Sequence, residues 1–258
     1  KRKRHPRQRQ PCTRASDMTI DLRGGASAPL SASPRVLVVV TGVTPGAGAS
    51  MVAATIADAA CALSTADGSG VAVALVYPCD DVAANDVKNG ATGMAPVNDG
   101  LLAGARESGA RFVMPEPGHT PPADDGAWLQ AGGNPDVLVV DVSADNRQRW
   151  LNMPAALTVE VLVARPSIPS IRQLGTYLQD PSVGRTPVIA VTAAHADTPE
   201  LVTLVAAGFT SAAPACEAYF PLDHDLAITG VPATFPDTQL ATARSILTRV
   251  GALEGALA

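Results

Sequence analysis

The chain has 258 residues, of which 47% are hydrophobic and only 3% aromatic, and its formal net charge is −5. This length suits one α/β domain or two small ones, and the apolar content supplies a large core of Ala, Val, Leu and Ile. No apolar run approaches the ~20 residues that span a bilayer, and no apolar segment follows the N-terminal charges as in a signal peptide, so we expect neither a membrane-spanning nor an exported protein.

Basic residues are concentrated at the start of the chain. Residues 1–14 carry seven of the 19 basic residues and no acid, which leaves 12 basic against 24 acidic residues, a net charge of −12, for the remainder. Such an acidic body argues against nucleic-acid binding by the folded part. Residues 1–33 are rich in Arg, Pro, Ser and Gly, which predicts a disordered basic leader or linker before a domain at 34–258. The alternative is that residues 1–14 contact nucleic acid or acidic lipid.

From residue 35 onward, apolar segments typical of strands alternate with helical segments. The predicted order is strand 35–41, helix 50–63, strand 71–77, an irregular segment 81–100, helix 100–108, strand 110–114, loop 118–126, helical turn 127–131, strand 136–141, helix 146–153, strand 158–164, helix 168–178, strand 187–192, helix 199–207 and helix 237–257. This alternation predicts an α/β fold with a doubly wound, mainly parallel sheet of about six to eight strands between two helical layers. Ligands of such folds bind beyond the carboxyl ends of the strands.

The first strand runs into a glycine-rich loop that opens a helix, which is the layout of a phosphate-binding loop. Backbone N–H groups and the helix dipole hold the phosphate there, a lysine neutralises it, and a hydroxyl holds Mg²⁺. The glycines and the hydroxyl are present: Gly42, Gly46, Gly48 and Ser50. The lysine position holds Ala49, and the only lysine after the first three residues is Lys88. The alternative is a glycine-rich turn that serves close packing alone.

Other polar residues give weaker signals. Four acids lie near strand ends and are candidates for Mg²⁺ binding or base catalysis, or else helix caps and solvated loop acids: Asp80, Asp81, Asp141 and Asp145. The histidines His119, His195 and His224 lie in separate loops and form a metal site only if the fold joins two of them. Ser167 and Ser170 are expected to cap a helix, and the widely spaced Cys12, Cys61, Cys79 and Cys216 to be reduced thiols.

Thr44–Ser50 resembles the deviant Walker A loop of the ParA/MinD superfamily, Lys-Gly-Gly-x-Gly-Lys-Ser/Thr. It is more similar still to the actinobacterial CpaE/TadZ-like branch (septum-site-determining and Flp-pilus-neighbourhood proteins), whose loop often reads Gly-Gly-Ala-Gly-Ala-Ser. Further segments resemble that family's small-residue helix, Walker B strand, segment after switch II and adenine-side loop: Met51–Ala57, Val139–Asp141, Leu162–Arg172 and Phe220–Gly230. The likeness covers about residues 35–250.

The resemblance implies a P-loop NTPase fold that binds ATP or ADP with Mg²⁺. It assigns the phosphates to Gly42, Thr44, Pro45, Gly46, Ala47, Gly48, Ala49, Ser50 and Met51. It assigns Mg²⁺ to Ser50 and Asp141, and the surroundings of adenine to Thr192, Pro221 and Asp223. Asp141 and Asp145 remain weak candidates for a catalytic acid or base.

Several family positions have changed together. Thr44 stands at the signature lysine, Pro45 at the first glycine, and Tyr77–Cys79 where an Asp-x-Asp is expected. Switch II reads Asp141–Asp145 in place of Asp-Thr-Pro-Pro, and the adenine-reading Asn is Thr192. These changes predict a pseudo-ATPase.

The leading hypothesis is a cytoplasmic, non-hydrolysing scaffold, recruited to membrane or cell pole, that dimerises or binds a partner in a pilus, secretion or division machine. One alternative is a slow ATPase completed in trans by Arg172, Arg185 or a partner's arginine. The other is a nucleoid-associated partition protein that binds DNA through residues 1–14.

Overall fold

The computed structural model describes residues 33–68, 70–78, 90–98, 100–179, 187–194, 198, 216–221, 230–249 and 251. The predicted leader, except Ser33, and the predicted helix 199–207 lie outside these residues. The same is true of Asp80, Asp81, His195 and His224.

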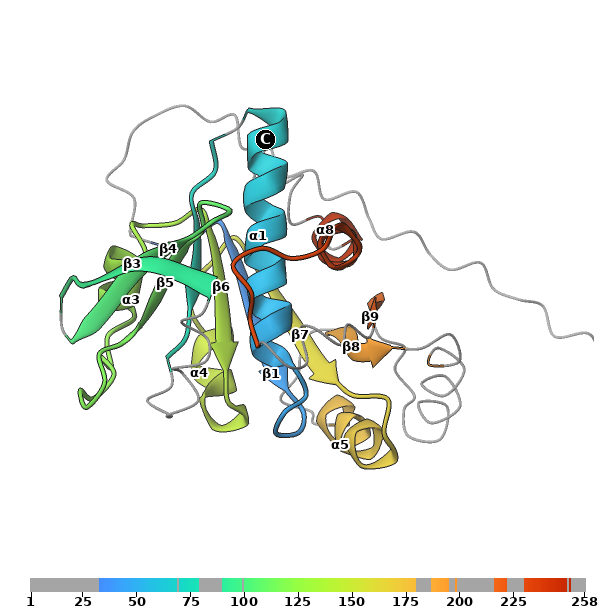
Figure 1. Cartoon of the computed structure of the whole chain (residues 1–258). Helices are drawn as coiled ribbons and strands as arrows, with labels where there is room; N and C mark the ends of the chain where they lie inside the picture. The colour runs from blue at the N-terminus through green and yellow to red at the C-terminus, as the bar shows by residue number, and fades with distance from the viewer. Residues whose placement is uncertain are drawn as a thin grey trace, which may run out of the picture.

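A nine-stranded sheet runs through the described part of the chain, in the order β3-β4-β5-β2-β6-β1-β7-β8-β9 (Figure 1). The strands are β1 (Val36–Gly42), β2 (Val73–Val76), β3 (Ala91–Pro96), β4 (Leu101–Arg106), β5 (Arg111–Pro115), β6 (Val137–Val142), β7 (Leu157–Ala164), β8 (Val188–Ala194) and β9 (Cys216–Pro221). From β5 to β9 every neighbouring pair is parallel, whereas β3 and β4 form an antiparallel edge. The predicted mainly parallel sheet is confirmed.

Helices cover both faces of the sheet, which confirms the predicted three-layer α/β/α architecture. On one face α1 (Ala49–Asp67) packs against α8 (Asp237–Arg249) and the strands beneath it. The opposite face is covered by α3 (Asp125–Ala131), α4 (Arg147–Leu151) and α5 (Ile168–Leu178). A 3₁₀ turn, η2 (Ala144–Asn146), leads into α4.

Strand β1 lies inside the sheet and is held on both sides by its neighbours. Its residues Val36–Thr41 are all buried, because β6 and β7 flank it and helical layers cover both of its faces. Alternate residues enter opposite cores, with Val38 beneath α1 and Val39 on the other face. The chain order changes direction on either side of β1, so its carboxyl end is a topological switch point.

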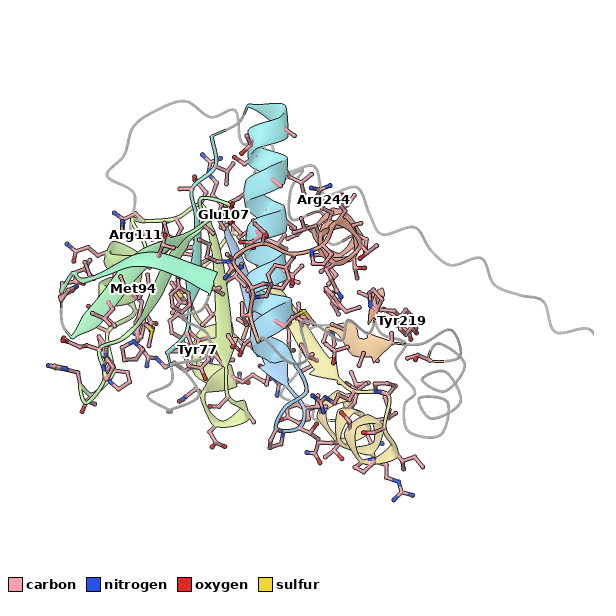
Figure 2. All side chains as sticks on the ribbon, viewed as in Figure 1. Tyr77, Met94, Glu107, Arg111, Tyr219 and Arg244 are labelled. Carbon is pink, nitrogen blue, oxygen red and sulfur yellow. The ribbon has the colours of Figure 1, made fainter. Side chains whose placement is uncertain are left out.

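The prediction was wrong at one edge of the sheet. Residues 100–108, predicted as a helix, contain β4, and the segment 81–100, predicted as irregular, contains β3. Antiparallel pairing with β5 makes 101–106 a strand, despite residues that also suit a helix. Gly104 is required there, because a Cβ atom would stand 2.6 Å from the backbone carbonyl oxygen of Thr92, and also 2.5 Å from the Met94 sulfur. Figure 2 shows Met94 on this β3 edge.

The prediction also missed β9, so the expected six to eight strands are nine. Cys216–Pro221 was assigned no strand, although Ala218 and Phe220 alternate into the core beneath α8. The predicted helix 237–257 is described as far as Arg249, where α8 ends.

By length and composition, α1 is apolar enough at Ala49–Ala66 to cross a membrane, although 61% of that window is buried inside the protein. It packs against β1, β2, β6 and α8. It is therefore a core helix in this fold.

Candidate functional site

The loop between β1 and α1 forms a turn whose last N–H groups, at the start of α1, have no acceptor among the described residues. Gly46 and Gly48 have φ values of 69° and 92°, left-handed conformations that glycine adopts without strain. Gly48 is the N-cap of α1 and supplies no side-chain cap. In the described part of the chain, no acceptor pairs with the N–H groups of Gly48, Ala49, Ser50 and Met51. The helix N-terminus therefore presents free donors and a positive dipole end, which suits an anion.

Two features of the loop reduce the number of backbone N–H groups that could bind an anion. Pro45 has no backbone N–H, so one donor of a full phosphate loop is missing. The Ala47 N–H is also unavailable, because it donates to the Thr44 carbonyl at 3.1 Å.

Hydroxyl groups from two later elements hold the loop in place. Thr192, buried at the end of β8, donates from Oγ1 to the Ala47 carbonyl at 2.6 Å and also reaches the Ala164 carbonyl at 3.4 Å. Ser170, on α5, lies with its Oγ 3.2 Å from Thr44 Oγ1 and accepts the Arg165 backbone N–H at 2.9 Å. The expectation that Ser170 caps a helix is wrong, because it ties α5 to the loop and to the end of β7.

Thr192 thus lies beside the loop, where a Cβ atom on Gly48 would stand 3.2 Å from its methyl group. Of the other residues assigned to adenine, Pro221 is exposed at the end of β9, three strands from β1. Asp223 lies outside the described residues.

The two residues assigned to Mg²⁺ are in contact. Ser50, in the first turn of α1, donates from Oγ to Asp141 Oδ2 at 2.5 Å. The parallel register of β1 and β6 produces this contact, because it sets Asp141 opposite Val40, near the end of β1. Asp141 is 5% exposed, and burial raises its pKa to about 6, although the Ser50 hydrogen bond opposes the shift.

A hydroxyl and a carboxylate are hard oxygen donors of the kind Mg²⁺ prefers, so this pair fits the ion. No group of three or more His, Cys, Asp or Glu side chains able to hold a metal occurs in the described ranges. A magnesium ion here would need phosphate oxygens or water to complete its shell. His119 is the one histidine that the structure describes. Its Nδ1 lies 3.6 Å from Glu116 Oε2 on the surface.

A pocket of about 740 Å³ opens beside the loop, between β6, α4 and the segment after β2. Its polar wall includes Ser50, Asp141 and Asp145, and its floor includes Trp128 and Trp150, whose ring centroids lie 6.2 Å apart. Figure 2 shows another lining residue, Tyr77, toward the lower end of the molecule, where β1 runs into the loop. This volume is in the usual range for small-molecule sites.

Three arginines near this edge were not singled out by the sequence interpretation. Arg147, at the start of α4, is buried and forms an ion pair with Glu160. Arg149 contacts Asp125 at 2.6 Å and forms part of the pocket wall. Arg165, which follows β7, places its Nη2 4.0 Å from the position of a Cβ atom on Gly46. Arg165 lies within a segment with family resemblance, but no local pattern indicates that it faces the loop.

No family model matches the sequence, and no curated protein matches it either. Among solved structures, the chain is similar to the MinD cell division protein of Aquifex aeolicus, with 18% identity, 83% of this chain and 97% of that chain covered, and a TM-score of 0.53. It is similar to the same species' MinC:MinD cell division protein complex, with 18% identity, 83% and 96% coverage, and a TM-score of 0.52. It is also similar to the septum site-determining protein MinD complexed with Mg-ADP from Pyrococcus horikoshii OT3, with 15% identity, 87% and 99% coverage, and a TM-score of 0.51. These likenesses establish that the chain has the MinD fold.

Proposed function

We propose that this chain is a nucleotide-binding relative of the ParA/MinD superfamily, from its CpaE/TadZ-like branch, that holds ATP or ADP with Mg²⁺ without hydrolysing it. In this proposal it acts in the cytoplasm, recruited to a membrane or cell pole, as a scaffold for a pilus, secretion or division machine. One observation carries the proposal: Ala49 stands in the lysine position of a loop whose free N–H groups and Ser50–Asp141 pair remain.

The energetics favour retained binding over retained chemistry. A lost charge-assisted contact costs about 1.5–3 kcal/mol, which weakens binding about ten- to hundredfold but leaves the backbone donors in place. Phosphoryl transfer depends on cations that stabilise charge in the transition state, so it suffers more from the same loss. Two further candidate catalytic positions, Thr44 and Tyr77, also lack the charge expected by the resemblance.

The comparison supports a protein partner. One structural neighbour is a MinC:MinD complex, and we extend the idea of a partner, or of a homodimer through the loop face, to this chain. The pocket wall formed by η2 and α4 lies next to the proposed ligand, so nucleotide occupancy is positioned to alter that face.

The test combines calorimetric titration of MgATP and MgADP with a phosphate-release assay on the same preparation. We expect saturable binding and no Mg²⁺-dependent turnover, with binding weakened by Ser50→Ala and unchanged by Ser245→Ala on α8. Turnover that Ser50→Ala abolishes would show an active ATPase. Absence of binding at millimolar nucleotide would remove the nucleotide from the proposal.

A slow ATPase completed in trans is the second candidate. It is favoured by Arg172, which is exposed on α5 and forms no ion pair with a described residue. This candidate predicts a specific activity that rises with protein concentration or on addition of a partner. A specific activity independent of both would count against it. Arg185, the other named arginine, lies outside the described residues.

A further inference from the structure

Arg165 is a cation beside the loop that has no ion-pair partner in the described part of the chain. It is exposed, and no carboxylate of the described residues forms an ion pair with it. Its guanidinium Nη2 lies 4.0 Å from where a Cβ atom on Gly46 would stand, and apart from the glycine's own chain neighbours nothing else described comes within 4 Å of that position. The glycine therefore leaves the space between the loop and the guanidinium open.

The fold fixes the base of this side chain relative to the loop. The backbone N–H of Arg165 donates to Ser170 Oγ, which also contacts Thr44 Oγ1. Thr192 bridges the carbonyls of Ala47, in the loop, and Ala164, the residue before Arg165. Two hydroxyls thus join the loop and the end of β7 on both sides of Arg165.

The other arginines described around this edge have carboxylate partners or lie farther along α5. Arg147 is buried against Glu160, and Arg149 is held by Asp125 and the Ala123 carbonyl. Either would have to give up its partner to bind a phosphate, whereas Arg165 has no carboxylate partner among the residues that the structure describes. An arginine also presents a planar fork that binds two phosphate oxygens at once.

We propose that Arg165 supplies, within the same chain, the positive charge that Ala49 removes from the loop. Its ligand is the phosphate chain of a nucleoside di- or triphosphate, which it contacts from the β7 side while the N–H groups at the start of α1 contact it from the other. This inference rests on the proposed function, because the loop must hold a nucleotide for Arg165 to act on it. It makes the cation a residue of this chain, in contrast to an arginine supplied in trans.

The test titrates the full chain and three variants with MgATP, MgADP and inorganic pyrophosphate, by calorimetry and by tryptophan fluorescence. The fluorescence comes from Trp128 and Trp150, which are the chain's two tryptophans and both line the pocket. Arg165→Gln removes the charge, Arg165→Lys keeps it, and Arg244→Gln makes the same charge change on α8. Figure 2 shows Arg244 far from the lower end of the molecule, where the loop lies.

We expect Arg165→Gln to weaken the binding of all three ligands about ten- to hundredfold. Arg165→Lys should recover part of this loss of affinity, and Arg244→Gln should leave the affinities unchanged. Thermal unfolding without ligand should be the same in all four proteins, because the substitutions keep the Arg165 backbone contact. The affinity of the wild-type protein for all three ligands should also fall as salt is added.

The outcomes separate the two proposals. Nucleotide binding that survives Arg165→Gln undiminished would overturn the role of Arg165 and leave the nucleotide proposal intact. Arg165-dependent binding of pyrophosphate without binding of nucleotides would support the phosphate contact and overturn the nucleotide proposal. Binding of none of the three ligands by the wild-type chain would overturn both.

Discussion

Restoring the missing lysine with Ala49→Lys should tighten nucleotide binding. Ala49 is the first residue of α1 and lines the 740 Å³ pocket together with Ser50 and Asp141. A lysine side chain there extends into the open pocket, so it need not displace a core residue. Its ammonium reaches the space next to the free N–H groups of the helix start, where the phosphates are proposed to lie.

The size of the effect follows from two opposing terms. A charge-assisted contact to phosphate contributes about 1.5–3 kcal/mol, whereas a cation in the first helical turn costs about 0.3–1 kcal/mol against the dipole. The net gain is therefore about 0.5–2.7 kcal/mol, which corresponds to about two- to hundredfold tighter MgATP binding. Hydrolysis should stay absent, because Thr44 and Tyr77 still occupy two positions where the resemblance expects charged residues.

Calorimetry on wild-type protein, Ala49→Lys and Ala241→Lys measures this gain, and the last variant adds the same charge to an exposed position of α8. An Ala49→Lys protein that unfolds like wild type and binds MgATP no more tightly would refute the geometry of the cradle. Equal tightening by Ala241→Lys would show that long-range charge, and not the loop position, is responsible. Turnover restored by Ala49→Lys alone would refute the idea that several catalytic positions were lost together.

Three further substitutions test the contacts around the loop and the core. Burial raises the pKa of Asp141 from 3.8 to about 6, so the folded state takes up a proton more readily than the unfolded state. The protonated Asp141 therefore contributes to the free energy of unfolding, and this contribution is fully present below pH 3.8 and is lost as the pH rises through 6. An asparagine carries no charge at any pH, so Asp141→Asn should raise the free energy of urea unfolding over wild type by up to about 3 kcal/mol at pH 7 and leave it unchanged near pH 4. Thr192→Val leaves the Ala47 carbonyl without its donor, so we expect the free energy of unfolding to fall by about 1–3 kcal/mol and nucleotide binding to weaken. Unchanged values would show that the hydrogen bond from Thr192 to the loop is dispensable. Asp58→Asn leaves the buried Arg106 guanidinium, which donates to Asp58 twice at 2.8 Å, without a counter-charge, and the unfolding free energy should fall by about 3–5 kcal/mol; a loss below 1 kcal/mol would mean that water reaches the pair.

The parts of the fold predicted from the sequence are those in which local pattern and tertiary position agree. Strand β1 is a continuous run of Val and Leu that can only be buried on both faces, and β6 repeats the pattern. The segment Leu101–Arg106 carries leucines, alanines and no β-branched residue, a composition that suits a helix as well as a strand. Pairing with β5 makes this segment a strand, and a short stretch of sequence does not show which segments pair across a sheet.

The same limit applies to the site. The family resemblance assigns Ser50 and Asp141 to one Mg²⁺ ion, and the structure brings the two side chains into contact. Their role as magnesium ligands stays a prediction. The roles of Ser170, Thr192 and Arg165 depend on β7 lying next to β1 and β8 next to β7, which only the strand order supplies. The resemblance marks Thr192 as a departure from asparagine, but only the strand order brings its hydroxyl to the Ala47 carbonyl.

The proposed cation position bears on how the function that we propose, nucleotide binding without hydrolysis, would work. An interaction accelerates a reaction only when it is stronger in the transition state than with the bound substrate. Ser170 accepts the backbone N–H of Arg165, and in our proposal the guanidinium contacts the phosphate chain of the bound nucleotide. A nucleotide bound in this way stabilises the folded state by about 2.7 kcal/mol at a hundred times its dissociation constant. Because the pocket wall is formed by η2 and α4, that energy would order the same surface that we propose to meet a partner. Nucleotide would then act as a ligand that sets the partner-binding state, and hydrolysis would not be needed for that role.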